Sequence, residues 1–179
     1  ILIGMPGAGK STVGVVLAKK RGCRFLDSDL LIQEKYNALL HELISKYGAE
    51  EFQRMEEKVN ASVEFQFSTW TDWGEKYKMV LTTGGADRTV IATGGSAVYG
   101  AAAMEHLKRI GTVVYLKLSC DTIRERLGDL NERGVILREG QTLEDLYEER
   151  VPLYEKYADI VLDCEKKRIR DIVDELSRV

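Results

Sequence analysis

The stretch Ile1-Leu2-Ile3-Gly4-Met5-Pro6-Gly7-Ala8-Gly9-Lys10-Ser11-Thr12 opens the chain and decides its fold. It matches the phosphate-binding pattern G-x-x-x-x-G-K-[ST], with Gly4 and Gly9 as the two glycines and Lys10-Ser11 as the final pair. An apolar run precedes the loop and a helical pattern follows it, which is the strand–loop–helix context that this pattern requires. The sequence therefore predicts a Walker A loop that binds a nucleoside triphosphate, ATP, together with Mg²⁺.

Each residue type in this loop suits a phosphate group. Glycines let the backbone N–H groups turn toward an anion, and the N-terminus of the following helix adds positive potential. We expect Lys10 to reach the β- and γ-phosphates and Ser11 to bind Mg²⁺. The residues expected to contact the nucleotide here are Gly7, Ala8, Gly9, Lys10, Ser11 and Thr12.

Length and composition limit the classes of protein to consider. The chain has 179 residues, 44% of them hydrophobic, so we expect residues 1–179 to form a single domain and a monomer. The formal net charge of -3 gives no broad basic field, and no apolar run is long enough to cross a bilayer, so we expect neither nucleic acid nor membrane as a partner. The three cysteines show no C-x-x-C spacing, which favours reduced thiols in the cytoplasm.

Two carboxylates follow the second predicted strand, residues 23–26. Alternate residues of an extended chain point the same way, so we expect Asp27 and Asp29 both to face the phosphate loop at the carboxyl edge of the sheet, where α/β proteins bind ligands. One carboxylate could hold Mg²⁺ through water while the other takes a proton from a hydroxyl group. The alternative is that an acidic residue here only caps the next helix.

Helical apolar spacing returns in residues 30–36, 39–47 and 49–64, with Gly48 as a break, and predicts a helical flap over residues 30–64. Residues 65–88 instead concentrate aromatic side chains among small polar residues, which suits an extra hairpin or an aromatic surface. A cover for the core and a surface for a partner are both open interpretations of this aromatic stretch.

A strand followed by a glycine pair occurs twice, ending at Gly84-Gly85 and at Gly94-Gly95. We favour Gly94-Gly95 as the functional pair, because a predicted helix over 101–109 follows it, whereas Gly84-Gly85 has the composition of a turn. The remaining elements expected are strands over 112–118 and 160–162, helices over 120–127, 142–157 and 168–178, and a polar lid over 128–141. This alternation of strands and helices indicates an α/β fold, a parallel sheet between two layers of helices.

Several short motifs stand in a fixed order along the chain. They are the phosphate loop, Asp27-x-Asp29, Gly48-x-x-x-Phe52-x-x-x-Glu56, Thr93-Gly94-Gly95-Ser96, an arginine-bearing lid, and Arg150-x-Pro152-Leu153-Tyr154. The ordered set covers nearly the whole chain and resembles shikimate kinase. The resemblance implies a three-layer P-loop kinase fold of the nucleoside-monophosphate-kinase kind, with a five-stranded parallel sheet, a substrate flap and a mobile lid. It also implies transfer of the γ-phosphate of ATP to a hydroxyl of shikimate, in aromatic amino acid biosynthesis.

The resemblance also implies a role for individual residues. Lys10 would stabilise the transferring phosphoryl group, and Asp29 would hold the substrate hydroxyls and act as the base. Ser11 would bind Mg²⁺ directly and Asp27 through water. The other residues implied are Arg126 against adenine, Arg133 on the phosphates, Gly94 and Gly95 beside the substrate, and Gln53 and Arg150 toward the substrate carboxylate.

The chain departs from the family pattern at the carboxylate clamp. Gln53 stands where the family has an arginine, and Arg54 is displaced from that position by about 100° around the helix. The lid has Arg133-Gly134 where the family usually has arginine followed by proline. Two alternatives to shikimate phosphorylation therefore stay open: a kinase for another small hydroxy acid or polyol, and a module that binds ATP without catalysis.

Overall fold

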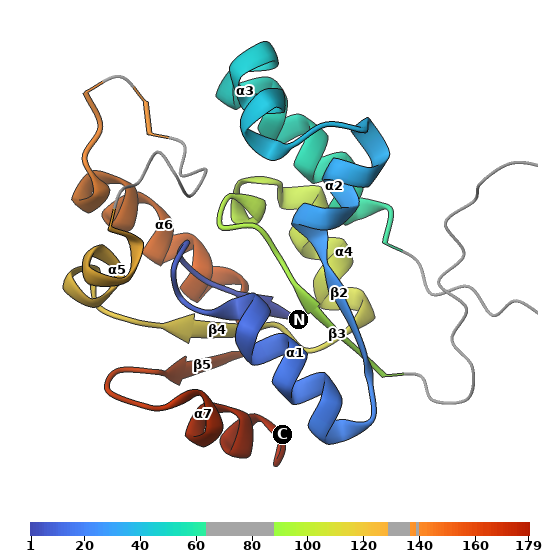
Figure 1. Cartoon of the computed structure of the whole chain (residues 1–179), viewed down its shortest axis with the longest axis vertical. Coiled ribbons are helices and arrows are strands. Elements are labelled where there is room, and N and C mark those ends of the chain that lie inside the picture. The colour runs from blue at the N-terminus through green and yellow to red at the C-terminus, as the bar shows by residue number, and fades with distance from the viewer. Residues whose placement is uncertain (64–87, 129–136, 139) are drawn as a thin grey trace, which may run out of the picture.

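A computed structural model of the chain describes residues 1–63, 88–128, 137–138 and 140–179 (Figure 1). The aromatic stretch 65–88, except for its last residue, lies outside the described residues, and Gly84-Gly85 lies within that stretch. Most of the expected lid, including Arg133, also lies outside them.

Five strands form one parallel sheet in the order β2-β3-β1-β4-β5. They are β1 (Leu2–Ile3), β2 (Arg24–Asp27), β3 (Thr89–Ala92), β4 (Val114–Lys117) and β5 (Ile160–Asp163). Leu2 of the central strand β1 pairs with Ala92 on one side and Val114 on the other. The five-stranded parallel sheet predicted from the sequence is confirmed, and the strand that leads into the phosphate loop lies at its centre.

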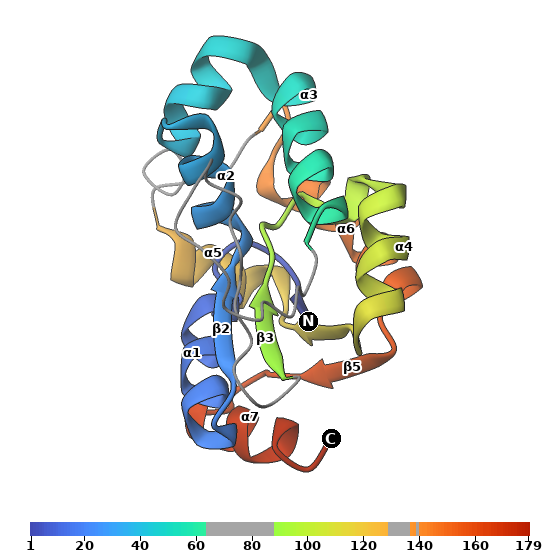
Figure 2. The same ribbon diagram turned by 90° about the vertical axis from the view of Figure 1, so that its right-hand side faces the viewer.

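Helices cover both faces of the sheet, which confirms the expected three layers (Figure 2). One face carries α1 and α7, and the other carries α4 and α6. The helices are α1 (Lys10–Arg21), α2 (Ser28–Tyr36), α3 (Leu40–Ala61), α4 (Ala101–Ile110), α5 (Cys120–Leu127), α6 (Leu143–Tyr157) and α7 (Ile169–Leu176), with a 3₁₀ turn η1 (Ala97–Tyr99). No helix in the described part of the chain is both long and apolar enough to cross a membrane.

The expected flap consists of α2 and α3, which share a second hydrophobic core with strands β2 and β3. Ile32 of α2 and Phe52 of α3 are buried with Leu26 and Ile91 from strands β2 and β3. At Gly48 the backbone has φ 78° and ψ 169°, so α3 is two helical segments joined at the predicted break. Burial of this apolar face fixes the flap beside the carboxyl ends of the strands.

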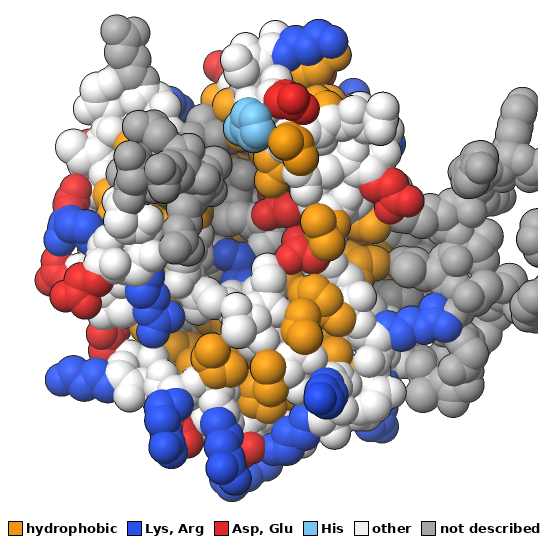
Figure 3. All heavy atoms as spheres, viewed as in Figure 1, with side chains coloured by type: hydrophobic (Ala, Val, Ile, Leu, Met, Phe, Trp, Pro, Cys, Tyr) orange, Lys and Arg blue, Asp and Glu red, His pale blue; other side chains and the backbone are white. Residues whose placement is uncertain are grey.

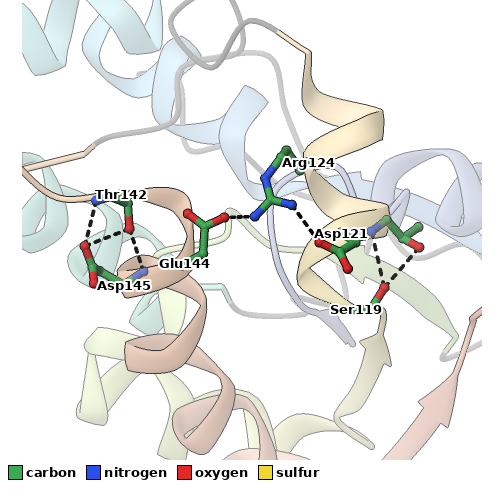
Figure 4. A network of polar contacts seen from close by, with 7 residues as sticks. Ser119, Asp121, Arg124, Thr142, Glu144 and Asp145 are labelled. Atoms are coloured by element: carbon green, nitrogen blue, oxygen red, sulfur yellow. Dashed lines mark hydrogen bonds and ion pairs between the residues drawn. The ribbon is translucent and has the colours of Figure 1, made fainter.

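Helices α5 and α6 flank the 128–141 segment and are linked directly to each other. Arg124 of α5 binds Asp121, at 2.6 Å, and also binds Glu144 in the first turn of α6 (Figure 4). Thr142 caps α6: its hydroxyl accepts the N–H of Asp145 at 3.1 Å, and the Asp145 carboxylate accepts the N–H of Thr142 at 2.9 Å. Thr142 and Asp145 thus form a capping box, and a separate ion pair between Arg124 and Glu144 joins α5 to α6.

Candidate active site

The phosphate loop connects β1 to α1 with a backbone that requires glycine. Gly4 has φ 145°, and a Cβ atom there would lie 2.9 Å from the carbonyl oxygen of Leu116. Gly9 has φ 88° and is the last residue before α1 begins at Lys10. Between them the N–H of Ala8 donates to the carbonyl of Met5 at 3.1 Å, which closes the loop tightly. The result is a tight turn at a helix N-terminus, a geometry that favours anion binding.

The Lys10 side chain lies along this loop. Its Nζ donates to the carbonyl oxygens of Gly4 at 2.8 Å and Met5 at 2.9 Å, and only 8% of the residue is exposed. Burial lowers the pKa of Lys10 to about 8, against the opposing effect of the Asp29 carboxylate. Because an ammonium group has three donors, one N–H beyond these two bonds can serve a phosphate oxygen.

Ser11 and Asp27, the two residues expected to hold Mg²⁺, are in contact, but the chain around Asp27 differs from the expected extended one. The Ser11 hydroxyl donates to Asp27 Oδ2 at 2.6 Å. Asp27 Oδ1 accepts the N–H of Asp29 at 3.0 Å and caps α2, which begins at Ser28. Asp29 therefore faces the site from the first helical turn, and strand alternation was the wrong reason for pairing the two acids. Helix capping and a place in the site coexist in Asp27.

Asp29 lies between the phosphate loop and the Gly94-Gly95 turn. Burial, reinforced by the charge of Asp27, raises the pKa of Asp29 to about 6, while Lys10 acts in the opposite direction. Asp29 is consequently ionised at neutral pH and still basic enough to accept a proton, the combination that general-base catalysis uses.

The Gly94-Gly95 turn follows β3 and leaves no room for side chains. A Cβ atom on Gly94 would lie 2.3 Å from Glu56 Oε1 and 2.7 Å from Asp29 Oδ1. A Cβ atom on Gly95 would lie 2.7 Å from Pro6 Cδ in the phosphate loop and 3.2 Å from Arg150 Nη1. Backbone thus takes the place of side chains at the point where the phosphate loop, two carboxylates and an arginine converge.

Arg150 enters this region from α6 and is 3% exposed. Its Nε donates to the Tyr99 hydroxyl at 3.2 Å, and its guanidinium carbon lies 5.2 Å from the centroid of the Tyr99 ring. One turn further along α6, the Tyr154 hydroxyl donates to the carbonyl of Gly95 at 2.6 Å. A buried cation is thereby fixed beside the glycine turn.

Glu56 is a site residue to which the sequence analysis gave no role. It is 1% exposed, its Oε2 accepts the Ser96 hydroxyl at 2.6 Å, and its Oε1 has no hydrogen-bond partner among the residues that the structure describes. Burial raises the pKa of Glu56 to about 7, although the bond from Ser96 lowers it. Glu56 follows Phe52 by four residues, so it lies on the apolar face of α3. An acidic residue on an apolar helix face was the signal in the sequence that could have pointed to a role for Glu56.

A cavity of about 440 Å³ unites these groups. Among its lining residues are Gly7, Gly9, Lys10, Ser11, Thr12, Asp29, Leu40, Ile44, Phe52, Gly94, Gly95, Arg126 and Arg150. Charged side chains of both signs gather near the centre of this face, beneath the flap (Figure 3). The structure therefore brings most of the predicted nucleotide residues and most of the predicted substrate residues to one cavity; Ala8 is not among its lining residues, and Arg133 lies outside the described part of the chain.

Gln53, the residue of α3 expected to contact the substrate carboxylate, is not among the residues that line this cavity. Gln53 is half-buried and follows Phe52, which does line it. Arg54 is exposed and binds Glu51 at 3.0 Å on the outer side of the helix. In the described part of the chain, Arg150 is thus the cation on the acceptor side, and Arg126 lies beside Gly7 on the nucleotide side.

Comparison with known families places these residues in context. The family model for shikimate kinase matches residues 6–179. A shikimate kinase of Thiobacillus denitrificans is 34% identical over 171 residues, which cover 94% of this chain and 82% of that protein. One from Thermodesulfovibrio yellowstonii is 31% identical over 180 residues, which cover 99% of this chain and 92% of that protein.

Solved structures give the same result. Shikimate kinase from Acinetobacter baumannii in complex with shikimate has a TM-score of 0.77 and 30% identity, and the match covers 98% of this chain and 88% of that one. Shikimate kinase from Aquifex aeolicus has a TM-score of 0.73 and 27% identity, and the match covers 98% and 91% of the two chains. Both similarities extend over the flap, the phosphate loop and the sheet.

Proposed function

The chain belongs to the shikimate kinase family, and we propose that it transfers the γ-phosphoryl group of ATP to a hydroxyl of shikimate, giving shikimate 3-phosphate and ADP. One observation carries the proposal: Lys10, Asp29 and Arg150 border a single cavity. Phosphoryl transfer to a hydroxy acid needs positive charge at the phosphates, a base at the hydroxyl and a cation at the carboxylate. These three residues supply those groups in that order.

On the nucleotide side, the loop N–H groups and Lys10 bind the β- and γ-phosphates. Lys10 stabilises the charge that develops on the transferring group, because it is buried and keeps a donor free of the two loop carbonyls. Arg126 packs against adenine, and Arg133 of the lid reaches the phosphates. The catalytic role of Arg133 rests on the family resemblance, since that residue lies outside the described part of the chain.

The oxygen atoms of Ser11 and Asp27 fit a Mg²⁺ site. They lie 2.6 Å apart beside the phosphate loop, and Mg²⁺ prefers such hard oxygen ligands. No cluster of three or more His, Cys, Asp or Glu side chains suited to a metal occurs among the described residues, so phosphate and water would complete the shell. Mg²⁺ bound there would neutralise phosphate charge, with Ser11 as a direct ligand and Asp27 acting through water.

On the acceptor side, Asp29 takes the proton of the attacking hydroxyl. Arg150 binds the carboxylate of shikimate, and Gly94 and Gly95 allow the ring to approach the backbone. The apolar side chain of Phe52 lines the same cavity and packs against the ring.

The direct test is ADP production by the purified protein with Mg²⁺ and ATP, with and without millimolar shikimate. We expect ADP formation to depend on shikimate, and to fall strongly when the carboxylate of shikimate is replaced by a hydroxymethyl group. Shikimate-independent ADP formation, or equal rates with both acceptors, would contradict the proposed acceptor and the role of Arg150.

Gln53 favours a second candidate, a kinase for another small hydroxy acid or polyol. A bidentate arginine–carboxylate contact is strong and directional, and glutamine offers only a neutral amide. If shikimate is the acceptor, Gln53→Arg should lower its KM by roughly tenfold, the effect of one added charged hydrogen bond. Gln53→Met is the matched control, because methionine keeps the length of the glutamine side chain and adds no charge. A raised or unchanged KM in Gln53→Arg would favour a different acceptor.

The proposal extends to the chain as a whole. Residues 1–179 act as one catalytic domain, with residues 30–64 as the acceptor flap and residues 128–141 as a mobile lid. We place this activity in the cytoplasm, in a monomer whose partner is a small-molecule substrate. Neither nucleic acid nor a membrane takes part in it.

A further inference from the structure

We propose that Tyr99 is a positioning residue for the acceptor: it holds the guanidinium of Arg150 in the orientation that receives a carboxylate. The inference rests on the proposed function, in which Arg150 binds the carboxylate of the acceptor. Tyr99 ends the 3₁₀ turn that follows Gly94-Gly95-Ser96, so it belongs to the same loop that borders the acceptor cavity.

Two contacts join Tyr99 to Arg150. The Tyr99 hydroxyl accepts the Nε–H of Arg150 at 3.2 Å, and the guanidinium carbon lies 5.2 Å from the ring centroid. A hydrogen bond at Nε fixes the rotation of the guanidinium, and a cation–π contact adds a second restraint on its position. Together they restrain a side chain that otherwise has many rotamers.

This arrangement leaves the outer end of Arg150 for the ligand. A guanidinium has five N–H donors, and the bond to Tyr99 uses the one on Nε, away from the two terminal nitrogens. Nη1 lies 3.2 Å from the position of a Cβ atom on Gly95, and Arg150 and Gly95 both line the cavity. The terminal nitrogens are the pair that binds a carboxylate bidentately.

Two hydrogen bonds attach the glycine loop to α6, and α6 supplies the donor in both. Arg150 of α6 donates to Tyr99 of the loop, and Tyr154 of α6 donates to the carbonyl of Gly95 at 2.6 Å. Burial raises the pKa of the Tyr99 hydroxyl, the bond from Arg150 opposes this, and Glu149 raises it further. The hydrogen bond and the ring contact between Tyr99 and Arg150 form in the protein without an acceptor, so Tyr99 can fix Arg150 before the acceptor arrives, and binding does not have to order that side chain.

The variant Tyr99→Phe tests this role, because it keeps the ring and removes the hydroxyl. We expect the KM for shikimate to rise roughly tenfold, the effect of one hydrogen bond to a charged group, with the KM for ATP unchanged and kcat changed less than twofold. Tyr147→Phe is the matched control: this tyrosine is also on α6, its hydroxyl donates to the carbonyl of Leu118 at 2.8 Å, and it is not among the residues that line the cavity. Its KM for shikimate should stay at the wild-type value.

A double-mutant comparison separates positioning from general loosening. If Tyr99 acts through Arg150, adding Tyr99→Phe to Arg150→Ala should leave the KM for shikimate at the value of Arg150→Ala alone. Two full, multiplying effects would show that Tyr99 acts by another route and would overturn the proposal. So would a wild-type KM for shikimate in Tyr99→Phe.

A measurement without substrate distinguishes failure of this inference from failure of the proposed function. The Nε–H of Arg150, observed by ¹⁵N NMR in the free protein, should exchange with solvent at least severalfold faster in Tyr99→Phe than in wild type, and at the wild-type rate in Tyr147→Phe. Equal rates in Tyr99→Phe would refute the positioning role whatever the acceptor is. Faster exchange in Tyr99→Phe, combined with no turnover of shikimate by the wild type, would support the contact and contradict the proposed function.

Discussion

At the scale of single residues, this site places two acids and two bases in one buried neighbourhood. Lys10, Asp29, Glu56 and Arg150 each act on the pKa values of others in the group. Burial lowers the pKa of Lys10 to about 8 and raises those of Asp29 and Glu56 to about 6 and 7. Lys10, Asp29 and Glu56 would each keep one charge state near neutral pH in water. In this site their pKa values lie close to neutral pH, as acid–base chemistry requires.

Asp29→Asn should remove most of the turnover and leave ATP affinity nearly intact, because the amide cannot take a proton while the phosphate loop is untouched. The check is kcat with shikimate, together with nucleotide binding by calorimetry. In the wild type, kcat/KM should fall as the pH drops below about 6, because Asp29 becomes protonated there; Asp27 and Lys10 are the charged groups that face it, and Glu56, with a pKa of about 7, is already mostly neutral at that pH. Unchanged turnover in the variant would refute the role of Asp29 as base.

The role of a residue in the site could be predicted where a sequence motif contains that residue, and could not be predicted where the role depends on burial in the folded chain. The pattern around Lys10 fixed the phosphate loop, and Asp27 and Asp29 were found beside it. Glu56 and Tyr99 were given no role, because each depends on a partner far along the chain: Glu56 on Ser96, and Tyr99 on Arg150. Nothing local in a sequence announces such partners, and an acid on an apolar helix face is a weak indication by itself.

At the scale of elements, α6 carries Arg150 to the cavity and Tyr154 to the carbonyl of Gly95, so its first turn matters for the site. The chain secures that turn with the Thr142–Asp145 capping box and with the bond from Arg124 to Glu144. The capping box was predictable because its residues are three apart in sequence. The Arg124 link joins two helices on either side of the 128–141 segment, and it was not predictable.

Thr142→Ala should lower the free energy of unfolding by about 1 kcal/mol, the usual cost of losing an N-cap side chain. The loss should be measurable as a lower midpoint in urea with an unchanged slope. We expect kcat to change little, since Thr142 does not line the cavity. Thr122→Ala is unsuitable as a control because Thr122 bonds Glu165, whereas the exposed Ser45→Ala removes a hydroxyl from a helix at little cost. A stability loss in Ser45→Ala as large as that in Thr142→Ala would contradict the capping account.

One helix boundary predicted from the local sequence pattern was wrong. Helix α2 begins at Ser28, two residues before the predicted start, because Asp27 caps it. That shift carries Asp29 from an extended strand into a helical turn. The expected convergence of the two acids survived because a helix N-terminus and a strand end both lie at the same edge of the sheet.

At the scale of the whole molecule, the site lies where the order of the sheet places it. The central strand β1 leads into the phosphate loop, and its neighbour β3 leads into the Gly94-Gly95 turn, so both turns emerge side by side at the carboxyl edge. The flap closes that edge from one direction and α6 from another. The alternation of strands and helices predicted this layout, whereas the packing of α3 over Gly94 could be seen only in the structure.

Stability of the whole fold should depend on pH through Glu56. Its pKa is raised from 4.5 in the unfolded chain to about 7, so the folded protein favours the protonated form, and stability is lost as pH rises from about 4.5 through 7. Glu56→Gln removes this dependence. Relative to wild type it should be up to about 3 kcal/mol more stable at pH 8, with no such advantage at pH 4, as urea unfolding at both pH values would show. A larger advantage at pH 4 would contradict the direction of the shift.

The central claim is that one cavity brings ATP and the hydroxyl of a carboxylic acid together for phosphoryl transfer. The most direct measurement is ³¹P NMR of a reaction of the wild-type protein with ATP, Mg²⁺ and shikimate. We predict a phosphate monoester signal coupled to the proton at C3 of shikimate, formed in equal amount with ADP. Release of inorganic phosphate in place of the ester, or ATP left intact in the presence of shikimate, would contradict the account.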